Sequence, residues 1–260
     1  KHLASAEQVT EVEEVRCLVQ SEPWCKEVKL ITAKRNKGQV QSFVDGITDV
    51  VNEHDKVIVL EDDQVTSKGF LKFMNEALEL YADEPKAMHV SGYMYPAEFE
   101  CEDTTFFLQV QSCPGWGTWK RAWDLYNHDA ADHLDYFSKS KSRIKKFNIE
   151  GHAYFYKQLE LNAGPVQYSW AVRWHASCIR VGGLSLFPAR SLVCNIGCDN
   201  TGVHCADTDF YDVEPVEYLS ISKVEVAENQ KIRQAVDALY KRHILAPPLE
   251  RLASSLRRNG

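Results

Sequence analysis

Apolar positions in the first half of the chain recur with the spacing of helices and strands in turn. Residues 5–20 carry valines and a leucine three or four positions apart, which predicts an amphipathic helix. Residues 28–32 favour a short strand, and residues 40–51 carry apolar side chains along one helical face. An uninterrupted apolar run at 57–60 then predicts a buried strand over residues 56–60.

The same alternation continues beyond this strand. Ser67 is a plausible N-cap for a helix whose apolar face runs to Tyr81, and residues 87–91 predict the next strand. Residues 224–245 have helical spacing near the C-terminus. Strands and helices in alternation predict an α/β protein with a largely parallel sheet covered on both faces. We expect one domain over residues 1–210 and a C-terminal helical extension over 211–260.

Three consecutive carboxylates, Glu61, Asp62 and Asp63, follow directly on the predicted strand 56–60. Like charges this close raise one another's pKa unless a positive group lies among them. Ligands of parallel α/β sheets bind outside the carboxyl ends of the strands, and carboxylate oxygens suit Mg²⁺ or Mn²⁺. The triplet is therefore a candidate cation site. On these residues alone, a solvated acidic loop is an equally good interpretation.

Composition and charge narrow the classes of function. The 260 residues are 44% apolar and 26% charged, as in an ordinary globular protein. A net charge of −7 leaves no excess of Lys and Arg to displace counterions, so nucleic acid is not an expected partner. No apolar run approaches the roughly 18 residues that span a bilayer. Eight scattered cysteines in a chain of this length favour reduced thiols and a cytoplasmic protein.

Five further segments of the chain belong to the same sequence pattern as the acidic triplet. They are RNKG (35–38), CPGWGTWKRAW (113–123), SWAVRWHAS (169–177), GLSLFP (183–188) and GVHC (202–205). Together with VIVLEDD and the following SKGFLKFMNEAL, they resemble the GT-A fold glycosyltransferases. The chain is similar to N-acetylglucosaminyltransferase I and closer to bacterial family 2-like sugar transferases. The resemblance covers about residues 30–205 and implies a Rossmann-like, mostly parallel sheet flanked by helices.

The resemblance also implies an activity and a set of site residues. A sugar would move from a nucleotide-diphosphate donor to a glycan or glycolipid acceptor, with inversion of configuration. Asp63 would bind Mn²⁺ or Mg²⁺, and His204 would complete the metal shell. Gly115 and Trp116 would contact the acceptor. The residues expected to contact the donor are Arg35, Asn36, Gly38, Glu61 and Asp62.

The general base of an inverting transfer is not identified by this match. The resembling sequences carry an Asp directly before the Ser-Trp pair, whereas Tyr168 stands there in this chain. A phenol with a pKa near 10 is a poor base at neutral pH. Glu160 is the nearest acid upstream. Glu160 and Tyr168 are therefore weak candidates, and a non-catalytic nucleotide- or sugar-binding protein on the same fold is the alternative function.

Three further expectations concern the rest of the chain. GT-A domains normally open with a strand that cradles the nucleotide base, and we expect this strand to be missing here. Cys194, Cys198, His204 and Cys205 offer a zinc site as a rival interpretation, because Cys-x₃-Cys is within zinc spacing. The last ten residues are basic. They could place the protein peripherally on the inner face of a membrane, since basic segments are attracted to anionic lipid.

Overall fold

The computed structural model describes residues 6–22, 24–164, 169–198 and 210–245. The chain divides into two compact units, an N-terminal unit (Lys1–Gln39) and a main unit (Val40–Gly260). The predicted division at residue 210 is not tested by this and stays a prediction. No helix in the described part of the chain is long and apolar enough to cross a membrane. The basic end, residues 251–260, lies outside the described residues.

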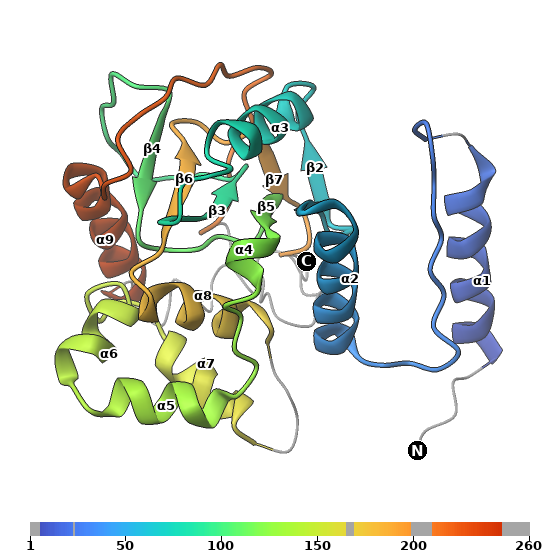
Figure 1. Cartoon of the computed structure of the whole chain (residues 1–260), viewed down its shortest axis with the longest axis horizontal. Helices are drawn as coiled ribbons and strands as arrows, with labels where there is room; N and C mark the ends of the chain where they lie inside the picture. The colour runs from blue at the N-terminus through green and yellow to red at the C-terminus, as the bar shows by residue number, and fades with distance from the viewer. Residues whose placement is uncertain (1–5, 23, 165–168, 199–209, 246–260) are drawn as a thin grey trace, which may run out of the picture. The chain divides into compact units, whose positions relative to one another are not determined.

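The N-terminal unit consists of one helix and one irregular segment. Helix α1 (Ala6–Ser21) confirms the helix expected over residues 5–20, and residues 25–33 lie beside it (Figure 1). The strand expected over residues 28–32 is wrong, because these residues form no β-ladder. A strand requires a partner, and the described part of this unit offers none. Sequence preference alone therefore did not produce a strand.

A five-stranded sheet with the order β1-β5-β3-β6-β4 forms the centre of the main unit. Its strands are β1 (Lys56–Val59), β3 (Ala87–Ser91), β4 (Thr105–Leu108), β5 (Trp116–Trp119) and β6 (Leu184–Pro188). Only β3 and β6 pair in parallel; the other three pairs are antiparallel. The α/β class is confirmed, whereas the mostly parallel sheet is wrong. The error arises because β5 inserts between β1 and β3 in the opposite direction, and β4 runs against β6.

Two hydrophobic cores lie on the two faces of this sheet. Helices α3 (Phe70–Leu80) and α9 (Gln230–Leu245) contribute to one core, and α2 (Gln39–His54) and α8 (Ala171–Arg180) contribute to the other. Figure 1 shows α9 beside β4. Helix α4 (Lys120–Trp123) adds to the second core. A third cluster is formed with α8 by α5 (Ala130–Ser138), α6 (Lys141–Phe147) and α7 (Phe155–Asn162). The helix predicted near the C-terminus is confirmed, with a start at Gln230.

The start of α3 differs from the prediction. Gly69 is the N-cap residue, and no side chain caps the helix. The backbone N–H of Phe70 donates to the carbonyl oxygen of Ser67 at 3.2 Å, while the Ser67 hydroxyl is buried without a hydrogen-bond partner among the described residues. Ser67 is therefore not the cap that its position suggested. The helix begins instead from a tight backbone turn, and Gly69 in this turn lies against residues 217–218.

The strand directions determine which segments meet at each edge of the sheet. Strands β1, β3 and β6 run the same way, and β5 runs against them. Val59 at the end of β1 therefore lies opposite Trp116 at the start of β5. Directly after the acidic triplet, β2 (Gln64–Thr66) pairs antiparallel with β7 (Val193–Asn195). Three distant segments of the sequence thus converge at the carboxyl end of β1.

Candidate functional site

The acidic triplet forms a turn between β1 and β2, and the side chain of Gln64 fixes this turn. The backbone N–H of Gln64 donates to the Glu61 carbonyl oxygen at 3.3 Å. The Gln64 side-chain oxygen accepts from the backbone N–H of Glu61 at 3.2 Å and from that of Gly115 at 2.8 Å. Gln64 therefore ties the acidic turn to the segment that precedes β5.

Asp63 is held by the last residue of β7 and the two residues that follow it. The backbone N–H of Ile196 donates to the Asp63 carbonyl oxygen at 2.8 Å, and the side-chain amide of Asn195 donates to Asp63 Oδ2 at 3.2 Å. Gly197 lies so close that a Cβ there would be 2.3 Å from Oδ2. The second oxygen, Oδ1, is buried and has no hydrogen-bond partner within the described part of the chain.

A buried carboxylate oxygen without a partner is uncommon and indicates a missing ligand, water or ion. The described residues contain no group of three or more His, Cys, Asp or Glu side chains arranged to hold a metal. Asp62 is exposed, so Asp63 is the member of the triplet with both carboxylate oxygens in a protein environment. Few protein ligands suit a cation whose remaining ligands are water and phosphate oxygens. The residues present fit a metal of that kind.

The carboxyl group of Glu61 is half-buried beside the two aspartates. Burial, followed by the negative charges of Asp63 and Asp62, raises the pKa of Glu61 to about 7. Near neutral pH this group is therefore partly protonated. The acidic turn then carries less negative charge than its three acids suggest.

An open groove of about 570 Å³ lies beside the Asp63 clamp. Asn195 and Cys198 line it together with Asp212 and Glu214. Its volume is within the range of small-molecule sites, roughly 300–1,000 Å³. The sequence did not indicate this groove, because its walls come from two segments that no motif connects.

The two residues predicted on the acceptor side are both buried. Gly115 has a φ of +52°, and a Cβ there would be 2.8 Å from the ring of Phe70, so glycine is required. Trp116 is fully buried, and its ring stacks on those of His89 and Trp170 at centroid distances of 5.0 and 5.4 Å. In this structure Trp116 offers no exposed ring surface to a sugar, although its backbone lies beside the acidic turn.

The predicted nucleotide loop belongs to the N-terminal unit, whereas the acidic turn belongs to the main unit. Arg35, Asn36 and Gly38 are exposed. The backbone N–H of Gly38 donates to the Asn36 side-chain oxygen at 2.7 Å, and Gly38 has a φ of +80°. These residues therefore form a local turn. Its contact with a donor stays a prediction.

Of the two candidates for catalysis, Glu160 lies among the described residues. Glu160 is exposed on α7 and forms an ion pair with Lys157 at 3.0 Å. Tyr168 and His204 lie outside the described residues. The general base therefore stays unassigned, and the metal role of His204 stays a prediction.

The cysteines differ from the expectation of reduced thiols throughout. Cys198 is disulfide-bonded. The described cysteines that are free are Cys17, Cys25, Cys101, Cys113, Cys178 and Cys194. A sulfur in a disulfide is not a thiolate and cannot ligate zinc, so the zinc interpretation is wrong in its use of Cys198. Cysteine spacing in the sequence does not show which sulfur atoms approach one another.

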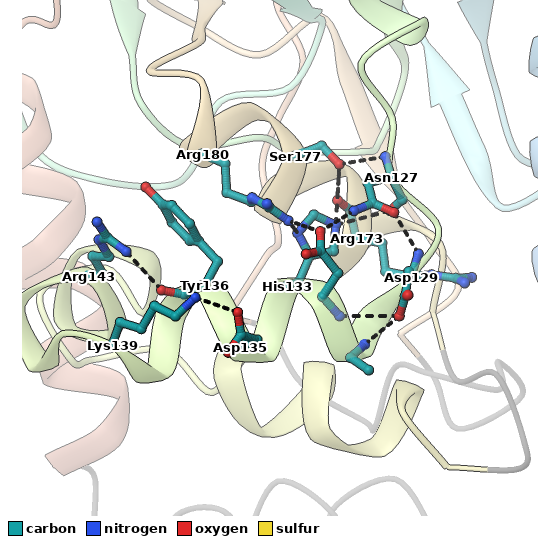
Figure 2. A network of polar contacts seen from close by, with 12 residues as sticks. Asn127, Asp129, His133, Asp135, Tyr136, Lys139, Arg143, Arg173, Ser177 and Arg180 are labelled. Atoms are coloured by element: carbon teal, nitrogen blue, oxygen red, sulfur yellow. Dashed lines mark hydrogen bonds and ion pairs between the residues drawn. The ribbon is translucent and has the colours of Figure 1, made fainter.

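A second polar cluster joins α5 to α8, and Figure 2 shows a serine and a histidine within it. Ser177 Oγ lies 3.4 Å from His133 Nε2, as in a nucleophile–base pair. However, the Ser177 hydroxyl donates to the Arg173 carbonyl oxygen at 2.8 Å, and His133 Nε2 bonds the Asn127 carbonyl oxygen at 3.0 Å. Arg180 donates to His133 Nδ1 at 3.2 Å.

These bonds use both ring nitrogens of His133 in its neutral form. Burial is the main cause that lowers the pKa of His133, and the charge of Arg180 adds to it. The ring therefore has no free position to accept a proton from Ser177. This cluster is a structural link between helices rather than a catalytic pair.

Comparison of the chain with protein-family models found no match, and comparison with curated protein sequences also found none.

Proposed function

We propose that this chain is a metal-dependent glycosyltransferase domain of the GT-A class. It moves a sugar from a nucleotide-diphosphate donor to a glycan or glycolipid acceptor, with inversion of configuration. The observation that carries the proposal is Asp63: one carboxylate oxygen is clamped by Asn195, and the other is buried without a partner among the described residues. The cytoplasmic location and the peripheral membrane contact are parts of the same proposal.

The clamp around Asp63 suits a role in holding a cation. Asn195 and Gly197 fix the carboxylate from one side, so its orientation does not depend on the ligand. Partial protonation of Glu61 reduces the repulsion among the three acids before a cation binds. When bound, Mn²⁺ or Mg²⁺ would supply Lewis-acid stabilisation of the departing nucleoside diphosphate.

The position of the turn is the second support. It lies at the carboxyl end of β1, beside Gly115 and next to a groove large enough for a small molecule. In this proposal the groove takes part of the donor, and the segment before β5 lies towards the acceptor. The antiparallel pairing of β1 with β5 supports the proposal, because it brings these two predicted segments to one edge of the sheet.

The alternative function is a non-catalytic nucleotide- or sugar-binding protein on the same fold. The state of Glu160 favours this alternative, because the side chain is exposed and paired with Lys157. The transferase and the nucleotide-binding form of the alternative both require nucleotide binding, and only the transferase consumes the donor. Release of free UDP from UDP-sugars, with and without added acceptor glycans, separates the two.

Calorimetric titration of UDP and GDP, with and without Mn²⁺, tests the shared requirement. Asp63→Asn removes the charge and keeps the shape of the side chain. Asp83→Asn is the matched control, because Asp83 is an exposed aspartate in the turn after α3. Metal-dependent binding that is lost with Asp63→Asn and kept with Asp83→Asn supports the proposal. Binding that is equal in all three proteins, or independent of Mn²⁺, contradicts it.

A further inference from the structure

Helix α6 carries a local concentration of positive charge on the surface of the main unit. Residues 139–146 contain five Lys and Arg and no Asp or Glu, in a chain whose net charge is −7. The lysines of this segment are exposed. On its other side, the helix buries Phe147 fully and packs Ile144 against the third cluster. Helix α6 is therefore amphipathic, with a cationic outer face.

Three lysines form this outer face, and we call them the α6 lysines: Lys141, Lys145 and Lys146. At 3.6 residues per turn, all three point within about 80° of the direction opposite Phe147. Lys145 forms an exposed ion pair with Glu150 at 3.1 Å, which solvent screens. Lys141 and Lys146 have no carboxylate partner in the described part of the chain. Most of the positive charge of this face is therefore accessible from solvent.

The other two cations of the segment contact α5. Lys139 pairs with Asp135 at 2.6 Å (Figure 2). Arg143 donates to the Tyr136 carbonyl oxygen at 3.0 Å, and its guanidinium lies over the Tyr136 ring, 4.2 Å from the centroid (Figure 2). Contacts within the fold therefore account for these two cations and leave the α6 lysines as the accessible charge.

The placement of the α6 lysines works against the stability of the helix itself. Lys141 is the first residue of α6, where the helix dipole disfavours a positive charge, and the first turn holds no acidic residue. Lys141 and Lys145 are four residues apart, and like charges at this spacing destabilise a helix. Local rules of this kind are broken mainly at functional sites. The cationic face is therefore a candidate binding surface for an anionic partner.

We infer that the α6 lysines dock the main unit on an anionic membrane surface. A cluster of about four to eight Lys and Arg on an amphipathic helix is typical of binding to anionic lipid. Side chains that leave one helix face side by side meet a flat surface together, whereas a small anion requires donors that converge on it. Helix α6 lies apart from β2 and β7 in Figure 1, so docking leaves the groove beside Asp63 open. The contact does not use the basic C-terminal end, and it does not depend on transferase activity.

Co-sedimentation of the full 260-residue chain with lipid vesicles tests this docking. The vesicles contain phosphatidylcholine alone or phosphatidylcholine mixed with phosphatidylglycerol. We expect binding to the anionic vesicles at about 0.05 M salt, and weaker binding at about 0.3 M, because salt screens the charges. Lys141→Gln, Lys145→Gln and Lys146→Gln combined should weaken binding about 100-fold, since each positive charge near an anionic surface contributes about 5-fold.

Two further triple variants are matched to this one, and both should bind like the parent. Replacement of Lys72, Lys86 and Lys223 by Gln removes the same charge from exposed lysines of the main unit outside residues 139–146. Replacement of the α6 lysines by Arg keeps their charge.

Several outcomes would overturn the inference. One is parent-like binding by the Gln variant of the α6 lysines, and another is an equal loss in the variant of Lys72, Lys86 and Lys223. A third is a parent chain that binds neutral vesicles as well as anionic ones, or that binds neither. Binding to heparin without binding to vesicles would assign the face to a soluble polyanion instead of a membrane.

Discussion

His89 on β3 should make the stability of the main unit fall at mildly acid pH. The side chain is fully buried, with its ring stacked on Trp116. The Nε2–H group donates to the Ser112 carbonyl oxygen at 2.9 Å, and Nδ1 accepts from the Trp174 indole N–H at 3.2 Å. Both nitrogens are therefore used by the neutral ring, and protonation would break the bond to Trp174.

Burial is the main cause that lowers the pKa of His89 from 6.5 to about 3. Above pH 6.5 the ring is neutral in both the folded and the unfolded chain, and its contribution to stability is fully present. As the pH falls below 6.5, the unfolded chain binds a proton that the folded chain excludes, so stability is lost. At pH 5, which is 1.5 units below 6.5, the loss is about 2 kcal/mol at 1.36 kcal/mol per unit.

Urea unfolding of the parent and of His89→Gln at pH 8 and pH 5 measures this loss. Glutamine keeps a donor for the Ser112 carbonyl oxygen and an acceptor for the indole of Trp174. A comparison of the two proteins cancels other groups that titrate in this window, such as Glu61 and His175. Between pH 8 and pH 5 the parent should lose about 2 kcal/mol more than the variant.

His54→Gln is the matched control, because the side chain of His54 is 62% exposed. It should lose as much stability between the two pH values as the parent does. If His89→Gln also loses as much as the parent, then the folded state does not exclude a proton from His89, and the argument from burial fails.

Three further predictions follow from other contacts. Glu61→Gln should raise the free energy of unfolding relative to the parent, by about 1–2 kcal/mol more at pH 8 than at pH 5, in urea unfolding without metal. The reason is that the raised pKa of Glu61 makes the parent lose stability as the pH rises from 4.5 to about 7. An equal gain at both pH values would contradict this. Arg233→Met should lower the free energy of unfolding by about 3 kcal/mol in thermal denaturation, since it removes the buried guanidinium that pairs with the partly buried carboxylates of Glu228 and Asp237. A loss below about 1 kcal/mol would show the pairs to be dispensable. Gly197→Ala should weaken metal-dependent nucleotide binding about 10-fold in calorimetry, because the added methyl group displaces Asp63. Gly46→Ala should not, because a Cβ there meets no atom within 4 Å. Equal binding by both variants would show that the position of Asp63 does not affect nucleotide binding.

The spacing of apolar residues correctly predicted the helices and strands whose own sequence shows which side chains are buried. Helices α2 and α3 and strands β1 and β3 carry continuous apolar faces, and all four lie close to where the pattern placed them. Strand β5 was not recognised, because its WGTW sequence carries no strand alternation and forms a strand only between β1 and β3. Strand β5 makes two of the four strand pairs antiparallel and β4 makes a third, so the mostly parallel sheet was wrong.

The acidic turn was visible in the sequence because its three acids are contiguous. The residues that hold it were not, since Asn195 lies 132 positions from Asp63 and a lone asparagine carries no signal. Gln64 directly follows the triplet and could have been noted as a turn residue. The burial of Trp116 was also hidden, because its neighbours His89 and Trp170 come from two other distant segments.

The pairing of β2 with β7 has a consequence for the order in which the molecule is completed. It joins residues 64–66 to residues 193–195, so the chain must close a loop of about 130 residues before the acidic turn takes its final shape. Contacts this far apart in sequence form late, because their entropy cost precedes their gain. During synthesis, Asp63 leaves the ribosome long before Asn195 does. A nascent chain can therefore build β1 and α3 while its acidic turn is still unclamped, and the site becomes complete only when most of the main unit has been made.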